Sequence, residues 1–94
     1  MNELQFEWDP VKAEENFRKH RVSFEDARTV FYDSFAVEFY DDEHSDWEGR
    51  FLLLGLSVQL KLLLVCHCYR ESESVIRLIS AREATKSEAG LYRR

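Results

Sequence analysis

Apolar and polar residues alternate, or recur with helical spacing, along most of the chain, and these patterns predict its secondary structure. Alternation over residues 4–8 predicts a short, half-buried strand. Asp9 is a good N-cap and Pro10 suits a first helical position, so we expect a helix from there to about His20. A capping-box pattern at residues 23–26 predicts a second helix directly afterwards.

The second half of the chain predicts mainly strands. Alternation over 35–40 and apolar runs at 51–56, 62–69 and 75–79 predict four of them. A further Ser-x-x-Glu pattern at Ser80 predicts that the last strand ends there and that a C-terminal helix follows. The expected fold is therefore α+β, with two N-terminal helices packed on a mostly antiparallel four- to five-stranded sheet and a C-terminal helix.

Length and composition indicate one domain over residues 1–94, with 45% apolar and 33% charged residues. No apolar run approaches the roughly 20 residues of a membrane span, and the N-terminus lacks a signal-peptide pattern, so we expect no membrane association and a cytoplasmic protein. Cys66 and Cys68 lie two apart on one predicted strand, a spacing that resists a disulfide.

The net charge of -5 is unevenly distributed along the chain. Residues 1–49 hold five Lys and Arg against fourteen Asp and Glu, whereas residues 50–94 hold eight against four. A cationic face can therefore exist despite the negative total, although the charges could equally serve only to solubilise two surfaces.

The strands at 62–69 and 75–79 predict a pair of chemically useful side chains. Pairing Tyr69 with Val75 places His67 opposite Arg77 on a polar face, whereas a slip of one residue would place Cys68 opposite Arg77. An imidazole beside a guanidinium could transfer protons and stabilise a phosphate. The alternative is a structural histidine.

Two other sets of residues suggest anion binding. A helix beginning at Ser80 would offer free backbone N–H groups beside Arg77 and Arg82, unless Ser80 is only an N-cap. Lys12, Asn16 and Lys19 share one face of the first helix and could point toward the sheet. Alternatively, that face is solvated and Glu15 pairs with both lysines.

Metal and cofactor sites are poorly supported. Strand alternation turns His67 away from Cys66 and Cys68, and the spacing fits no zinc pattern. His44 lies in an acidic segment that is more typical of a solvated loop than of a cation site. Because there is neither a Gly-rich phosphate loop nor a nucleophile elbow, we expect an enzyme of this sequence to work without a cofactor.

Several motifs resemble those of one known family. They are the Trp8-Asp9-Pro10 start followed by Lys12, Asn16, Lys19-His20 and Val22-Ser23-Phe24, then Arg50-Phe51, and finally Ile79-Ser80-Ala81-Arg82 with Ala84-Thr85. In this order they resemble BrnT-type toxins over nearly the whole chain. Arg21 and Leu60 depart from the family pattern, because they stand where glycines are common, so the helix end and the hairpin turn could be irregular.

The resemblance implies a ribonuclease toxin of a type II toxin–antitoxin system with a RelE-like fold. It implies metal-independent RNA cleavage, by attack of a 2′-OH on the adjacent phosphate, that arrests growth. The expected partner is a BrnA-like ribbon-helix-helix antitoxin, through which alone the toxin reaches operator DNA. A non-catalytic protein-interaction module on the same scaffold is the alternative, and a direct DNA binder is disfavoured by the acidic first half.

On this hypothesis, the candidate catalytic residues are His67, Arg77, Arg82, Lys19 and Lys12. Arg77 and Arg82 would hold the phosphate, His67 would act as general acid or base, and the lysines would activate the 2′-OH or bind phosphate. The candidate RNA-binding residues are Ser80, Tyr69, Arg70, His20 and Lys86.

Overall fold

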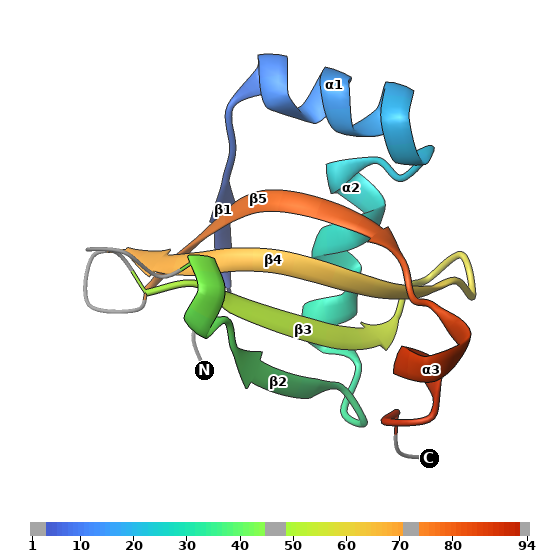
Figure 1. The fold of residues 1–94 in the computed structure, drawn as a ribbon. Helices are drawn as coiled ribbons and strands as arrows, with labels where there is room; N and C mark the ends of the chain where they lie inside the picture. The colour runs from blue at the N-terminus through green and yellow to red at the C-terminus, as the bar shows by residue number, and fades with distance from the viewer. Residues whose placement is uncertain (1–3, 45–48, 71–73, 93–94) are drawn as a thin grey trace.

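Five strands form one mixed sheet in the order β1-β5-β4-β3-β2 (Figure 1). The computed structural model describes residues 4–44, 49–70 and 74–92. β1 pairs with β5 in parallel and the other neighbours are antiparallel, so the expected α+β class and sheet are confirmed. The strands are β1 (Gln5–Glu7), β2 (Val37–Tyr40), β3 (Phe51–Leu56), β4 (Leu62–Arg70) and β5 (Val75–Glu83).

The first helix, α1 (Pro10–His20), has the predicted bounds. The Asp9 carboxylate accepts a hydrogen bond from the Val11 N–H at 2.9 Å, which satisfies a backbone donor that the helix cannot pair. The helix ends at Arg21, whose φ of 61° lies in the left-handed region that usually favours glycine. Arg21 thus adopts the conformation of the glycine it replaces, and its N–H donates to the Phe17 carbonyl oxygen at 2.8 Å as in an ordinary left-handed cap, so the helix end is not irregular.

The second predicted helix is only partly α-helical. Ser23 caps α2 (Phe24–Ala27), and its hydroxyl accepts from the Asp26 N–H at 3.0 Å. The chain continues as a 3-10 helix, η1 (Arg28–Tyr32), and a second 3-10 helix, η2 (Asp42–His44), follows β2. One Ser-x-x-Asp cap therefore starts a helical segment that tightens before it ends.

The predicted C-terminal helix start at Ser80 is wrong. β5 continues through Ser80 to Glu83, and α3 (Lys86–Ala89) begins after Thr85, which forms a complete capping box with Glu88. Ser80 instead pairs with Cys66 of β4. Because Ser80 lies within a strand, the anion site expected at a helix N-terminus does not exist there.

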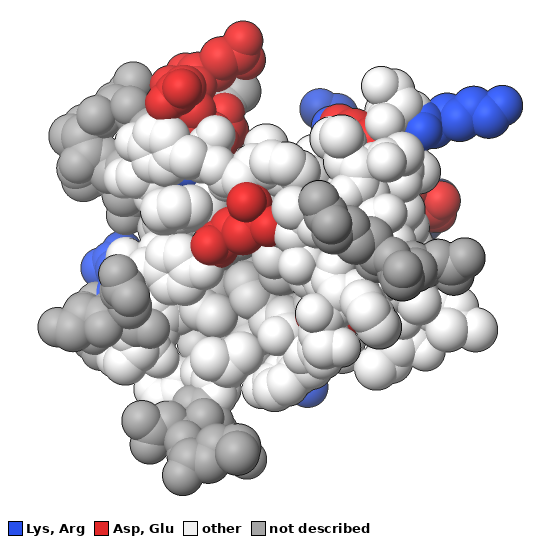
Figure 2. All heavy atoms as spheres, turned by 90° about the horizontal axis from the view of Figure 1, so that it is seen from below, with Lys and Arg blue, Asp and Glu red and all other residues white. Residues whose placement is uncertain are grey.

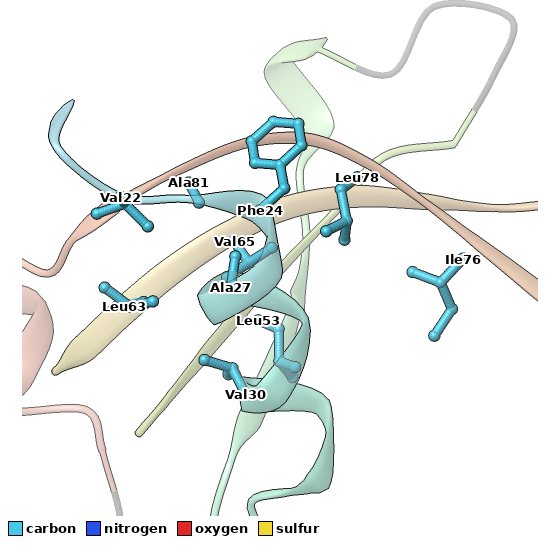
Figure 3. Close-up of a cluster of buried hydrophobic side chains, with 10 residues drawn as sticks. All are labelled: Val22, Phe24, Ala27, Val30, Leu53, Leu63, Val65, Ile76, Leu78 and Ala81. Carbon is cyan, nitrogen blue, oxygen red and sulfur yellow. The ribbon is translucent and has the colours of Figure 1, made fainter. Parts of the chain in front are cut away.

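The hydrophobic core lies between the sheet and the segment formed by α2 and η1 (Figure 3). Figure 1 shows this segment passing behind the strands, whereas α1 lies along the edge next to β5. Phe24, Ala27 and Val30 pack there against Leu53, Val65 and Leu78 of the three central strands. The opposite face of the sheet is crossed by neither α1 nor α2, and it borders the site described next.

The register of β4 and β5 differs from the prediction by one residue. His67 pairs with Leu78 and Cys68 with Arg77, so His67 and Arg77 lie on opposite faces of the sheet and the expected cross-strand pair is wrong. His67 is fully buried against Phe31, with a ring-centroid distance of 4.7 Å. Its burial is tolerated because Nδ1 lies 3.1 Å from the Val65 carbonyl oxygen and Nε2 lies 2.9 Å from the Glu38 carboxylate.

Candidate functional site: a basic groove beside a β-bulge

A β-bulge brings three polar residues of β5 onto one face of the sheet. Arg77 pairs with Cys68, and then the register shifts so that Ser80 pairs with Cys66 and Arg82 with Leu64. Simple alternation would place Arg77 on one face and both Ser80 and Arg82 on the other. The extra residue reverses that alternation, so all three side chains share the face that α1 and α2 leave uncrossed.

Asn16 fixes α1 against this part of β5. Its side-chain amide donates to the carbonyl oxygens of Ala81 at 2.8 Å and Val22 at 3.0 Å, and its oxygen accepts from the Ala81 N–H at 3.0 Å. β1 pairs with β5 only as far as Arg77, so at Ala81 the Asn16 carboxamide supplies the backbone hydrogen bonds that a neighbouring strand would otherwise make. Lys12 and Lys19 lie one turn before and after Asn16, so this contact also sets their position beside β5.

Two adjoining hollows lie between α1 and β5. One of about 90 Å³ is bordered by Asp9, Lys12, Arg50, Arg77, Leu78 and Ile79. The other, of about 200 Å³, is bordered by Lys12, Glu15, Asn16, Lys19, His20, Ile79 and Ser80. Because they share Lys12 and Ile79, we call them together the basic groove. It holds four Lys and Arg side chains against two carboxylates, one of which, on Asp9, caps α1.

The sequence left open that Lys12 and Lys19 pair with Glu15 on a solvated face of the helix, and the structure does not show this pairing. Among the described residues, neither Lys12 nor Lys19 forms an ion pair with Glu15. Arg77 is held by Glu7 of β1, with 2.9 Å between guanidinium nitrogen and carboxylate oxygen. The groove therefore combines one anchored guanidinium with two exposed ammonium groups, which suits binding of a phosphate.

A third hollow, which we call the sheet hollow, continues from the basic groove across the uncrossed face. Its volume is about 370 Å³, and it shares Arg50 and Ile79 with the first hollow of the groove. Leu52 and Leu64 contribute apolar side chains to this hollow, and Cys66 also borders it. Burial raises the pKa of the Cys66 thiol, against the opposing effect of the Arg50 guanidinium.

Arg82 borders the sheet hollow, but its guanidinium forms an ion pair with a carboxylate. Its two terminal nitrogens lie 2.9 and 2.8 Å from the two oxygens of Glu88 on α3. The hydrogen bonds from Arg82 are the main cause that lowers the pKa of Glu88 from its ordinary 4.5 to about 2, against the opposing effect of burial. Arg82 therefore brings less free positive charge to the site than the sequence suggested.

The structure separates the predicted site residues into two groups. Lys12, Lys19, His20, Arg77, Ser80 and Arg82 border the basic groove or the sheet hollow. His67 and Tyr69 face the α2 side, where both hydrogen-bond Glu38, while Arg70 and Lys86 border neither hollow. Among the described residues, few Lys and Arg atoms are visible on the side turned away from α1 (Figure 2).

Sequence reasoning gave no role to Arg50 or to the carboxamide of Asn16. Arg50 directly precedes β3, and its position in the family motif was the one available signal. The function of Asn16 depends on the edge of β5, about which the local sequence carries no information. Within the described residues, no cluster of His, Cys, Asp and Glu is arranged to hold a metal ion, and no helix is long and apolar enough to cross a membrane.

Comparisons with known proteins agree with this architecture. A family model for BrnT, the ribonuclease toxin of type II toxin–antitoxin systems, matches residues 8–88. The fold is similar to the crystal structure of the Brucella abortus ribonuclease toxin BrnT, with a TM-score of 0.68 and 23% identity over 89% of this chain and 100% of that one. No curated protein gives a significant match to the sequence.

A family match over most of the chain defines the class of protein: a ribonuclease toxin of a type II toxin–antitoxin system, whose partner is an antitoxin and whose substrate is RNA. The chain belongs to the BrnT family.

Proposed function

We propose that this toxin cleaves RNA without a metal ion, by attack of a 2′-OH on the adjacent phosphorus, with the scissile phosphate in the basic groove. The supporting observation is a hollow bordered by three cationic side chains, those of Lys12, Arg50 and Arg77, and by the carboxylate of Asp9, which caps α1. As the new P–O bond forms, the bond to the 5′-oxygen breaks, leaving a 2′,3′-cyclic phosphate and a 5′-OH end. Fixed cations stabilise the negative charge that develops on the phosphorane.

The groove also supplies a group for proton transfer. Of the two histidines whose side chains the structure describes, His20 borders the groove and His67 does not. An imidazole exchanges protons readily near neutral pH, so we assign His20 the transfer of the 2′-OH proton or of the proton to the leaving oxygen. Lys19 borders the same hollow, so we assign it either binding of the phosphate or promotion of 2′-OH ionisation.

The family supports a proposal for the biological setting. We propose that the antitoxin is a BrnA-like ribbon-helix-helix protein and that the toxin contacts operator DNA only through this antitoxin. In the absence of the antitoxin, the toxin would cleave RNA in the cytoplasm and arrest growth in the manner of an mRNA interferase. The relation to the RelE-type fold, which the sequence resemblance implied, stays a prediction.

The experiment compares purified wild type with Lys12→Ala, His20→Ala and Arg77→Ala on a labelled single-stranded RNA. Each change should lower kcat/KM by about 100-fold, because each removes a group that acts on the transition state. Arg18→Ala is the matched control: Arg18 lies on the same helix, is 72% exposed and pairs only with Glu14 among the described residues, so its activity should be unchanged. Circular dichroism checks the fold of each variant.

The products decide the chemistry. Cleavage in the presence of a chelator, with 2′,3′-cyclic phosphate ends, is the expected outcome. A Lys12→Ala/Arg77→Ala double variant that remains folded and cleaves at the wild-type rate would exclude the basic groove as the active site. A wild-type protein that binds its antitoxin but cleaves no RNA would instead favour the non-catalytic interaction module.

A further inference from the structure

We infer that the sheet hollow is a base-recognition subsite that takes a guanine flanking the scissile phosphate. This inference rests on the proposed RNA cleavage in the basic groove and names what sets its sequence preference. The hollow, at about 370 Å³, lies toward the lower end of the roughly 300–1,000 Å³ range of small-ligand sites. Its apolar part is formed by Leu52 of β3, Leu64 of β4 and Ile79 of β5, so one planar base can lie across three neighbouring strands.

The charges of the sheet hollow differ from those of the basic groove. Arg50 and Arg82 are matched there by Asp41, Glu43 and Glu88, whereas cations outnumber carboxylates in the groove. A phosphate would be repelled by the carboxylates and would prefer the groove. A neutral base with both donor and acceptor edges suits the mixed charges of the sheet hollow.

Asp41 and Arg50 give the hollow its preference for guanine. The Asp41 N–H donates to the Arg50 carbonyl oxygen at 2.8 Å, so the two residues are cross-strand neighbours at the same end of β2 and β3. Both residues border the sheet hollow, so a carboxylate and a guanidinium lie at one of its edges. Guanine presents two adjacent N–H donors, which a carboxylate accepts, next to an O6 acceptor, which a guanidinium contacts.

The neighbouring hollows link base and backbone recognition. Arg50 and Ile79 border both the sheet hollow and the part of the groove that contains Lys12 and Arg77. A single nucleotide could therefore place its base in the sheet hollow and its own phosphate in the basic groove. Unstacked bases of single-stranded RNA are recognised in this way, by hydrogen bonds to their exposed edges.

The test maps the cleavage sites of a randomised single-stranded RNA for wild type, Asp41→Asn and Asp42→Asn. Wild type should favour guanine at one position next to the cut by about tenfold, and Asp41→Asn should lose that preference while still cleaving. Asp42→Asn is the matched control, because Asp42 is an exposed neighbour that does not border the hollow, and it should keep the preference. Inosine in place of guanine removes one N–H donor and should slow the wild type several-fold but not Asp41→Asn.

A second measurement separates this inference from the proposed chemistry. Wild type should bind guanosine 3′-monophosphate more tightly than adenosine 3′-monophosphate, and Asp41→Asn should bind both alike. Groove-dependent cleavage with no base preference would overturn the guanine site and leave the nuclease intact. Selective guanosine binding without any RNA cleavage would support the guanine site and overturn the proposed function. Equal binding of both nucleotides by wild type would refute the guanine site directly.

Discussion

Replacing Asn16 by alanine tests whether the docking of α1 on β5 depends on one carboxamide. The side chain is buried, at 7% exposure, and makes three hydrogen bonds to the backbone of Ala81 and Val22. Alanine leaves one N–H and two carbonyl oxygens without this partner. A buried polar group left unpaired costs roughly 1–3 kcal/mol, and partial access of water reduces the cost for the carbonyls, so we expect the free energy of unfolding to fall by about 3 kcal/mol.

That loss is large for a protein of this size, because small domains unfold with only about 5–15 kcal/mol. Urea denaturation followed by circular dichroism measures it, and with a slope of roughly 1–3 kcal/mol per molar urea the midpoint should fall by about 1–3 M. Asn16→Asp should be destabilised similarly. The carboxylate keeps the acceptor for the Ala81 N–H, but it has no donor for the two carbonyl oxygens.

Glu14→Ala on the same helix is the control for this experiment. Glu14 is 74% exposed and lies 3.6 Å from Arg18, an exposed pair of a kind that contributes about 0.5 kcal/mol or less. If Asn16→Ala lowers the free energy of unfolding by less than about 1 kcal/mol, or no more than Glu14→Ala, the carboxamide does not hold α1 in place and the reasoning fails.

Two further predictions concern the turn before β4 and the C-terminal segment. Leu60 is 78% exposed and has a φ of 65°, in the left-handed region that strains a side chain with a Cβ atom. Leu60→Gly should remove this strain and raise Tm by about 5 °C, whereas the control Val58→Gly should not raise Tm. An unchanged Tm for Leu60→Gly would contradict this prediction. The lowered pKa of Glu88 means that its pairing with Arg82 stabilises the folded state above the ordinary pKa of 4.5, and that this stability is lost as pH falls toward 2. The difference in unfolding free energy between wild type and Glu88→Gln should therefore shrink over that interval, and a constant difference would refute the assignment.

Much of the fold could be predicted because the relevant interactions are local. Asp9 and Pro10 specify the start of α1 through a cap and a fixed φ, and the bounds of α1 agree with the prediction. The apolar run at Phe51–Leu56 coincides with β3. Ser80 was misleading because its motif does fit a helix start, but backbone pairing with β4 outweighs the local capping preference.

The candidate site was only partly predictable. The motif spacing placed Lys12 and Lys19 on one helix face, and both border the basic groove. His67 was assigned to the wrong face because the sequence favoured the register that pairs Tyr69 with Val75 and so places His67 opposite Arg77. In the structure its ring nitrogens face the Val65 carbonyl oxygen and the Glu38 carboxylate, so the slipped register carries no unpaired group.

By itself, the sequence determined the α+β class, the caps of its first helices, the strands of the sheet and membership of a toxin family. Only the tertiary structure decided which side chains meet. A bulge between β4 and β5 places Arg77, Ser80 and Arg82 on one face, and Asn16 brings the lysines of α1 to that edge. Both depend on contacts between residues far apart in the chain, since a register shift of one residue moves every following side chain to the other face and no local propensity specifies it.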